Sequence, residues 1–540
     1  MISRRSFGSA VALSTLVLAA GFRQPGSAQA AEEPRRGGTL NAIIQPEPVA
    51  LTAAVLSSAP TGIVGGNIFD GLIKYDLDLK PQPELATRWE ISPDGRTVTL
   101  HLRRGVTWHD GQPFTAADVA WSLENVWKPL NPRNPALFRN ITRAETPDPH
   151  TVVFHLAEPS VALFGLLNGN GAQILPKHLY EGTNVLTNPY NQKPVGTGPF
   201  VFKEWVKGSH ILLERNPHYW DAGKPYLDRI VFRVMPDGAA RAAALEKGEI
   251  HYAPLSPIPL RDADRLAKLP TIRVGTAGYA WLTPWLYLDF NVQSEAFRDV
   301  RVRRAVAHAI DRDALIKVVW FGFGTAAISP VASSLRPFHN PDVPLYPFDP
   351  KRAEALLDEA GLKRGPDGIR FAIVHDYLPY GEDYRRTGEF VKAALKRVGI
   401  EVTLRGQDTA AFTRRVYGER DFDLSSSWAS AFPDPQLGVA RLYSSEFVGR
   451  NIPWTNGSGF RNHEVDAIFK AVETEPDPAR RVAAWKRFQV IAQTELPTLP
   501  LVELKFFNVY AARLRNAVTR GDQIFGPLTE AWLDEPVKSQ

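Results

Sequence analysis

Hydrophobic and polar residues alternate most clearly in the stretch 194–237. A glycine- and proline-rich turn opens it, and the large apolar side chains of 200–205 alternate with polar neighbours, as do those of 211–213 and 230–234. A period of two is typical of strands that bury one face. The stretch therefore predicts a hairpin followed by a third strand. Its loops hold no cluster of residues suited to catalysis, so we interpret it as scaffold.

A second alternating stretch, 83–126, predicts a hairpin followed by a helix. A Pro-Asp-Gly turn at 93–95 separates two short alternating strands. Thr115 lies just before an apolar helical pattern, and Asp118 follows three residues later, which is the spacing of a capping box. The helix should therefore begin directly after Thr115.

Helical periodicity marks part of the C-terminal half. In 297–316 apolar residues recur at helical spacing, and the arginines between them are interpreted as a solvated helix face: Arg301, Arg303, Arg304 and Arg312. A strand, a helix and a strand are expected at 371–374, 387–398 and 400–404. This order predicts an α/β unit. By contrast, 56–66 is rich in serine, threonine and proline and is interpreted as a loop.

The first thirty residues have the order of an export signal. An arginine pair lies in the sequence SRRSF at 3–7, an apolar run covers 11–20, and Ala-Gln-Ala stands at 28–30. This order predicts a twin-arginine signal peptide that is removed from the mature protein; the alternative is a buried N-terminal helix. No later stretch approaches about twenty uninterrupted apolar residues, so the mature chain is expected to be soluble.

Composition narrows the classes of partner. The chain has no cysteine, which excludes disulfides, thiolate metal sites and a lipid-modified N-terminal cysteine. A freely diffusing periplasmic protein is therefore expected. The net charge is +5, and without the three arginines of the signal 60 basic residues face 58 acidic ones. This balance argues against a nucleic-acid or polybasic membrane partner.

Four stretches carry a resemblance to a known family. The sequences VGTGPF, LERNPHYW and LDRIVFRVMPD within 194–237, together with 83–126, 297–316 and 421–435, resemble the extracytoplasmic solute-binding proteins of peptide, nickel and related ABC importers. Matches of this length are more specific than a short motif. The resemblance implies an α/β fold like the type II periplasmic binding proteins, with a bilobal cleft and an extra inserted lobe, giving three lobes.

The resemblance also implies where each lobe begins and ends. The predicted parts are the signal at 1–30, lobe I in three pieces at 31–68, 191–284 and 506–540, inserted lobe II at 69–190, and lobe III at 285–505.

The family's ligand cleft predicts the site. The substrate-binding candidates are Ser58, Thr61, Trp281, Trp285, Trp428, Ser430, Phe432 and Asp434. The serine and threonine are equally typical of an ordinary loop, and the rings before residue 288 are more typical of a core than of a ligand contact. Where peptide-binding relatives hold the free amine with an aspartate, this chain has Ala431. A buried unpaired ammonium is costly, so this difference argues against standard recognition of a dipeptide or oligopeptide. Peptide-like, opine-like and sugar-derived solutes and metal chelates all remain open.

Chemistry other than binding finds little support in the sequence. The twelve histidines form no HxH or HxxxH pair, and GxSxG, HExxH, CxxC and P-loop motifs are absent. His109 and Asp110 are adjacent, but in a WHDGQP turn we expect them to bind backbone groups. We therefore expect no catalytic residue, metal or cofactor. The expected partners are a small-molecule or peptide ligand and an inner-membrane permease with its ATPase, the protein itself being a monomer. A periplasmic enzyme is the alternative.

Overall fold

The structure is a computed structural model that describes residues 33–56, 58–131, 135–449 and 452–534. The predicted signal peptide lies outside these residues. Everything below belongs to the unit Arg35–Gln540. Lobe I, lobe II and lobe III are used as names for the residue ranges given above, whose boundaries stay a prediction.

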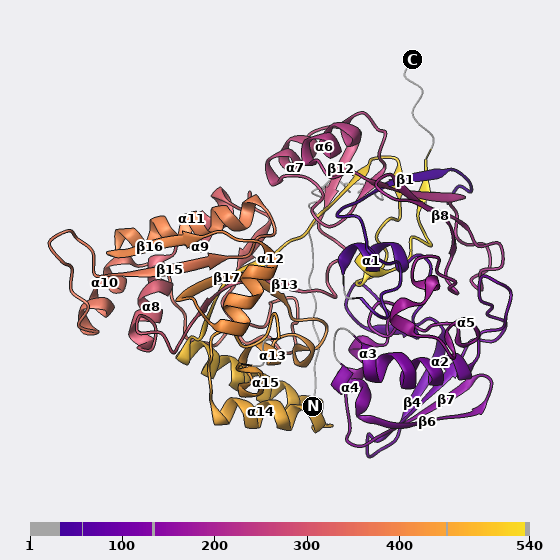
Figure 1. Ribbon diagram of the computed structural model, residues 1–540, viewed down its shortest axis with the longest axis horizontal. Helices are drawn as coiled ribbons and strands as arrows, with labels where there is room; N and C mark the ends of the chain where they lie inside the picture. Colours follow the sequence, from indigo (N-terminus) through magenta and orange to yellow (C-terminus); the bar gives the residue numbers. More distant parts are fainter. Residues whose placement is uncertain (1–32, 57, 132–134, 450–451, 535–540) are drawn as a thin grey trace, which may run out of the picture. The chain divides into compact units, whose positions relative to one another are not determined.

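A seven-stranded mixed sheet takes strands from both ends of the chain (Figure 1). Its order is β12-β19-β11-β1-β10-β9-β8. The strands are β1 (Thr39–Ile44), β8 (Phe200–Val206), β9 (His210–Arg215), β10 (Arg229–Val234), β11 (Tyr252–Ala253), β12 (Ile272–Gly275) and β19 (Asn508–Ala511). The hairpin and third strand predicted for 194–237 are β8, β9 and β10, so this prediction is confirmed. β19 lies between β11 and β12 and is antiparallel to both.

Short elements surround this sheet in lobe I. They are α1 (Ala59–Gly65), α6 (Gly238–Glu246), α7 (Leu260–Leu266), β20 (Leu514–Arg515), η8 (Gln523–Phe525) and β21 (Trp532–Leu533). β2 (Ile73–Tyr75) and β3 (Pro81–Pro83) pair with each other and lie in the range named lobe II. The loop predicted for 56–66 is wrong, because α1 occupies most of it. Ser58 caps that helix by accepting from the Thr61 amide, and Pro60 stands in its first turn, so local capping turns the polar segment into a helix.

An antiparallel four-stranded sheet forms most of lobe II, in the order β4-β5-β7-β6. Its elements are β4 (Ala86–Ile91), β5 (Thr97–Leu102), α2 (Ala116–Ser122), η1 (Leu123–Trp127), α3 (Lys128–Leu130), α4 (Pro135–Arg139), β6 (Ile141–Asp148), β7 (Thr151–Leu156), η2 (Ala162–Leu166), α5 (Lys177–Tyr180), η3 (Val185–Thr187) and η4 (Pro189–Asn191). The predicted helix start is confirmed, since the Asp118 carboxylate accepts from the Thr115 amide at 2.9 Å.

A six-stranded mixed sheet, β14-β18-β13-β17-β15-β16, forms the centre of lobe III. The strands are β13 (Pro284–Phe290), β14 (Gly324–Ala326), β15 (Phe371–Tyr377), β16 (Ile400–Arg405), β17 (Leu424–Ser430) and β18 (Thr498–Leu504). β15 and β16 run parallel and are joined through α11 (Glu382–Arg397), which confirms the predicted α/β unit.

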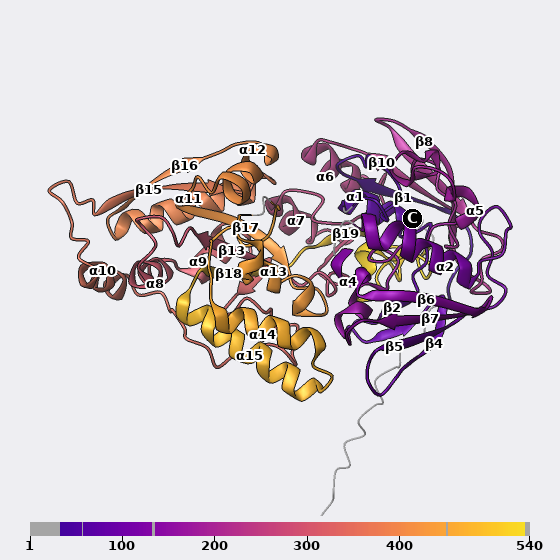
Figure 2. The same cartoon turned by 60° about the horizontal axis from the view of Figure 1, so that its bottom comes forward.

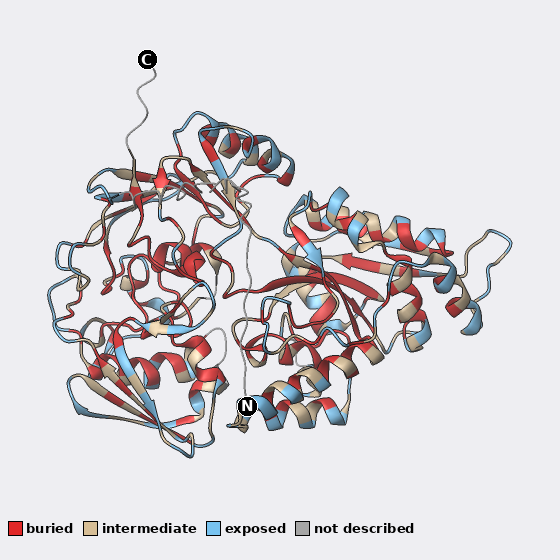
Figure 3. Ribbon diagram, turned by 180° about the vertical axis from the view of Figure 1, so that it is seen from behind, coloured by how far each residue is buried: buried red, intermediate tan, exposed pale blue. Residues whose placement is uncertain are grey.

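The remaining elements of lobe III pack around that sheet. They are α8 (Val300–Ala309), α9 (Arg312–Val318), α10 (Pro350–Glu359), α12 (Thr409–Thr413), η5 (Arg414–Glu419), η6 (Pro435–Leu437), α13 (Ala440–Tyr443), η7 (Ser445–Phe447), α14 (His463–Thr474) and α15 (Pro478–Glu495). The long helices α14 and α15 lie side by side (Figure 2). Buried residues concentrate on the strands and on the inward helix faces (Figure 3).

The solvated arginine face predicted for 297–316 is wrong for three of its members: Arg303, Arg304 and Arg312. Arg303 is 5% exposed and donates twice to the carbonyl of Glu495, at 3.1 and 2.6 Å. Arg304 donates to the carbonyl of Thr494 at 2.7 Å. These two carbonyls end α15, and the last carbonyls of a helix have no helical donor. Arg303 and Arg304 therefore cap a helix that is distant in sequence. Arg301 remains on the surface beside Asp299.

Candidate functional site

The chain passes between lobe I and lobe III at two places, and one tyrosine joins them. The hydroxyl of Tyr279 accepts from the amide of Leu255 at 2.6 Å and donates to the side-chain oxygen of Asn508 at 2.7 Å. Burial raises the pKa of Tyr279 well above its usual value, so the hydroxyl keeps the proton that it donates. Next to it, the amide of Ser256 donates to the carbonyl of Phe507 at 2.8 Å. The two crossings are thus fixed to each other at the base of the lobes.

Backbone in the left-handed region occurs near these crossings. Of the ten described residues other than glycine that have positive φ, four lie here, with φ between 42° and 61°: Leu255, Ser256, Thr283 and Phe432. A side chain in this left-handed region costs on the order of 1–3 kcal/mol, and such residues are concentrated at ligand sites and switch regions. The sequence did not point to the first three.

The predicted segment from Trp428 to Asp434 continues β17 past the end of the lobe III sheet. Trp428 is half-buried, and its ring meets Phe506 of the second crossing edge-on, with 5.3 Å between centroids. Ser430 is also half-buried and pairs with Pro284 at the start of β13. Both side chains therefore lie where lobe III meets the crossings. Their contact with a solute stays a prediction.

Phe432 and Trp281 bring lobe III against lobe I. Their ring centroids are 4.9 Å apart, and the ring planes are inclined at 62°. Trp281 is fully buried and donates to the carbonyl of Gly165 in lobe II at 3.3 Å. Trp285 is also buried and packs on Tyr287 at 4.8 Å in the core of lobe III. Of the predicted rings, Trp428 and Phe432 keep exposed surface, whereas Trp281 and Trp285 are core side chains in this arrangement.

The carboxylate of Asp434 is occupied by an arginine. Arg481 approaches both carboxylate oxygens at 2.7 Å, in a pair with side-chain exposures of 3% and 10%. Asp434 also caps η6 by accepting from the Gln436 amide at 2.9 Å. Bidentate pairing satisfies the planar edge of a carboxylate. Asp434 therefore holds the chain that follows it in place. Ala431, three residues earlier in the sequence, is fully buried.

Ser58 and Thr61 are engaged with each other and with the chain before them. The Ser58 hydroxyl donates to that of Thr61 at 2.8 Å, which in turn donates to the carbonyl of Ala50 at 2.8 Å. Thr61 is fully buried, and Ser58 is half-buried. The structure thus brings Trp428, Ser430, Phe432 and Asp434 together on one segment and places the lobe I pair in a helix start. A role of this pair in binding stays a prediction.

His109 has the structural role that we predicted for it. Its two ring nitrogens bind the backbone of Gly196 and Gly198, at 3.2 and 2.9 Å. Burial lowers its pKa to about 4, so the ring is neutral near pH 7. Asp110 also binds backbone as predicted, by accepting from the Gln112 amide at 3.1 Å, and it pairs with His178 at 2.6 Å. Among the described residues no group of three or more His, Cys, Asp or Glu side chains is arranged for a metal ion, and no helix in this part is long and apolar enough to cross a membrane.

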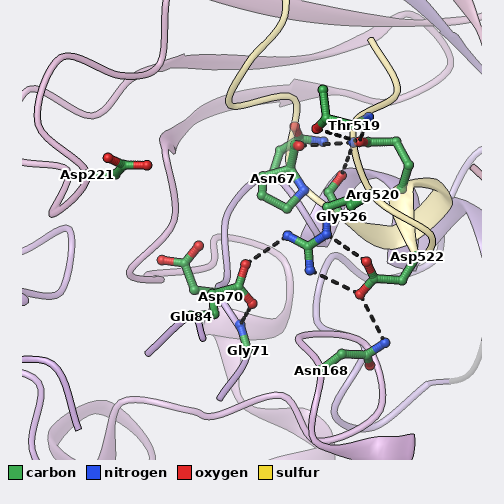
Figure 4. A network of polar contacts seen from close by, with 12 residues as sticks. Asn67, Asp70, Gly71, Glu84, Asn168, Asp221, Thr519, Arg520, Asp522 and Gly526 are labelled. Carbon is green, nitrogen blue, oxygen red and sulfur yellow. Dashed lines mark hydrogen bonds and ion pairs between the residues drawn. The ribbon is translucent and has the colours of Figure 1, made fainter. Parts of the chain in front are cut away.

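A separate buried network of charges joins residues of lobe I and lobe II (Figure 4). Arg520 donates to Glu84 at 2.8 Å and to both oxygens of Asp522 at 2.6 and 3.0 Å. Asp70 lies nearby and accepts from Trp220 at 2.8 Å. A cavity of about 300 Å³ opens beside the network. Because these charged groups pair with one another, we interpret the network as structural.

Comparison with known proteins decides the family. Residues 80–449 match the bacterial extracellular solute-binding proteins, family 5 Middle. The chain belongs to this family. The dipeptide-binding protein of Escherichia coli is 29% identical over 452 residues, which cover 79% of this chain and 81% of that protein. Glutathione-binding protein GsiB of Salmonella choleraesuis is 29% identical over 461 residues, covering 84% and 86%. The structure of NikA from Brucella suis in complex with Fe(III)-EDTA matches with a TM-score of 0.82 and 26% identity, covering 92% of this chain and all of that one.

The membership settles the coarse function. The predicted family and the multi-lobed α/β fold are confirmed, and this binding protein serves an ABC importer as its substrate-binding component. Its family consists of extracytoplasmic binding proteins rather than enzymes. The names of the relatives cover a dipeptide, glutathione and a metal chelate, so the family by itself leaves the solute open.

Proposed function

We propose that the binding protein captures a peptide-like or other organic solute between lobe I and lobe III and delivers it, as a monomer, to an inner-membrane permease. Closure on the solute would favour the form that docks, so binding energy becomes a population shift. Twin-arginine export to the periplasm and the eight candidate residues belong to this proposal. The hydrogen bonds that join the two crossings support it, because they give lobe I and lobe III a fixed point about which to move.

One observation carries the choice of solute. Ala431 presents no charge where the resemblance places an amine-binding aspartate, and the nearby carboxylate of Asp434 is taken by Arg481. A free ammonium buried at this place would lack a counter-charge. We therefore propose a solute whose recognition does not depend on a free α-amine, such as a modified peptide, an opine-like molecule or a sugar derivative with an apolar or planar portion.

The half-buried rings suit such a solute. Trp428 and Phe432 retain exposed surface on the same segment, and Ser430 between them offers a hydroxyl. Apolar rings with a few convergent polar groups are typical of small-molecule sites. An enclosed site of this kind can supply roughly −8 kcal/mol, which corresponds to a dissociation constant of about 1 μM.

Native mass spectrometry of the protein from its own periplasm, followed by release of the bound molecule, identifies the solute. Calorimetry then compares matched peptides with a free and an N-acetylated amino terminus. We expect the dissociation constants of each matched pair to agree within about threefold, because no carboxylate is available to pair with the charged amino terminus. A preference of about thirtyfold or more for the free amine, roughly 2 kcal/mol, would refute the proposal.

Ala431→Asp tests the same point from the protein side. An unpaired carboxylate placed at this buried position should favour cationic ligands, so the preference for free-amine over N-acetylated peptides should rise at least tenfold. Ala431→Asn is the matched control, since it adds a side chain of the same shape without charge. If both variants shift the preference equally, position 431 acts through its volume and the charge reasoning fails.

A further inference from the structure

Leu437 is a lobe III side chain that belongs to the core of the other two lobes. Among the described residues of 285–505, it is the one buried residue that joins the hydrophobic cluster running through lobes I and II. It is 7% exposed and lies in η6, directly after the candidate ligand segment. Burying a leucine side chain stabilises a contact substantially, so this contact favours the arrangement in which the lobes touch.

Gly165 of η2 in lobe II receives Leu437. A Cβ atom added at Gly165 would lie 2.5 Å from Cδ1 of Leu437, closer than such atoms come in proteins. The carbonyl of Gly165 accepts from Trp281 of lobe I at 3.3 Å. The absence of a side chain at Gly165 thus lets Leu437 approach the lobe II backbone at the place where lobe I also holds it.

Phe432 makes a second apolar contact, which joins lobe III to lobe I. Its ring lies 4.9 Å from that of Trp281, and its backbone, held at φ 59°, donates to the carbonyl of Leu282 and accepts from the Thr283 hydroxyl, both at 3.4 Å. The strained conformation aims the ring at lobe I. Phe432 and Leu437 therefore reach two different lobes from one short segment.

The segment that carries both side chains is rigidly based in lobe III. Asp434 lies between them in sequence. Its carboxylate pairs with Arg481 of α15, and its backbone carbonyl accepts from the Leu437 amide at 3.0 Å. Because this segment is fixed to α15, Phe432 and Leu437 move together with lobe III. A cavity of about 250 Å³ with walls from lobe II and from 436–474 lies at this boundary.

We propose that Leu437 and Phe432 are positioning residues that hold a substantial fraction of the ligand-free protein closed. The apparent affinity for a solute falls in proportion to the fraction of protein that is competent to bind. These two contacts therefore set part of the affinity, and Leu437 does so without touching the solute. The inference concerns lobe contacts alone, so its failure leaves the proposed transport function standing.

The absence of cysteine allows a direct measurement. Thr146→Cys in lobe II and Lys470→Cys in lobe III, both at exposed positions, place two spin labels at unique sites. Protein freed of solute by unfolding and refolding is examined by pulsed electron spin resonance. We expect Leu437→Ala to raise the ratio of open to closed protein about tenfold and lengthen the mean distance between labels. Leu442→Ala, also buried but within lobe III, is the matched control and should leave the distances unchanged.

Gly165→Ala provides a second route to the same result. Its added methyl group should displace Leu437 and open the protein, whereas in the double variant Gly165→Ala with Leu437→Ala it should cause no opening beyond that of Leu437→Ala. Circular dichroism confirms that each variant is folded, and the Gly165 variant decides the matter should Leu437→Ala not fold. Unchanged distances in folded Leu437→Ala or Gly165→Ala, or equal opening by Leu442→Ala, would overturn the proposal.

Discussion

The buried carboxyl of Asp70 should make the binding protein less stable as the pH rises. Asp70 is 2% exposed and faces Glu84, and these two factors raise its pKa to about 7 from the ordinary 3.8. Burial is the larger cause. Donors from Trp220, Tyr219 and Thr197 and the charge of Arg520 oppose it without cancelling it.

The sign follows from which state holds the proton. Between about pH 4 and pH 7 the folded protein keeps the Asp70 proton that the unfolded chain has lost. The contribution of this group to stability is therefore fully present below pH 4 and is lost as the pH rises through 7. Three pKa units at about 1.4 kcal/mol each give ~4 kcal/mol. With an unfolding entropy of about 2.1 cal/mol/K per residue over roughly 500 residues, this corresponds to about 4 °C in melting temperature.

Calorimetric melting of wild type and Asp70→Asn between pH 4.5 and 8.5 measures the effect. The difference between the two curves isolates Asp70, because His109 and the other buried groups titrate in both proteins. Asparagine loses an acceptor for the surrounding donors, which lowers the whole curve. The predicted quantity is therefore the slope: relative to the variant, wild type should lose about 4 °C as the pH rises. The exposed Asp264→Asn is the control and should leave the wild-type slope unchanged.

A difference curve that stays flat would refute the reasoning. It would mean that Asp70 is ionised throughout, so that its three donors outweigh burial and the neighbouring Glu84.

Two further substitutions test the candidate segment. Trp428→Ala should weaken solute binding at least tenfold in calorimetry while the melting temperature of the ligand-free protein stays within a few degrees, because the ring is only half-buried; a large loss of stability would instead make it a core ring. Arg481→Met should destabilise the protein by about 3–5 kcal/mol in thermal melting, because it leaves the Asp434 carboxylate buried without its counter-charge, and adding Asp434→Asn should recover most of the loss. No recovery in the double variant would show that packing, and not charge, causes the loss.

Local pattern explains which parts of the fold the sequence predicted well. The strands β8, β9 and β10 and the capping of α2 by Thr115 and Asp118 depend on neighbours a few residues away, and these predictions are confirmed. The three-lobed α/β fold followed from resemblance, which carries long-range information that periodicity lacks.

Long-range partners explain the errors. Arg303 reads as a surface residue in its own helix, and only the end of α15, 192 residues later, supplies the carbonyl that it binds. Asp434 looks like a free acid until Arg481 is brought to it, 47 residues away. In the candidate site, the resemblance pointed to the segment after Trp428, whose contact with a solute stays a prediction. The left-handed backbone of Leu255 and Ser256 was not predictable, because nothing in those residue types requires it.

The place of β19 in the seven-stranded sheet bears on how the chain folds. β11 and β12 meet only through residues 508–511, and Arg520 reaches Glu84 across 436 positions of sequence. Lobes II and III are each continuous in sequence and can form while the chain is still emerging, since domains generally fold as units from the N-terminus. Lobe I has to wait with two open strand edges, which are sites for unwanted pairing. A ribosome that stalls before residue 508 would therefore leave a chain with two finished lobes and an aggregation-prone third.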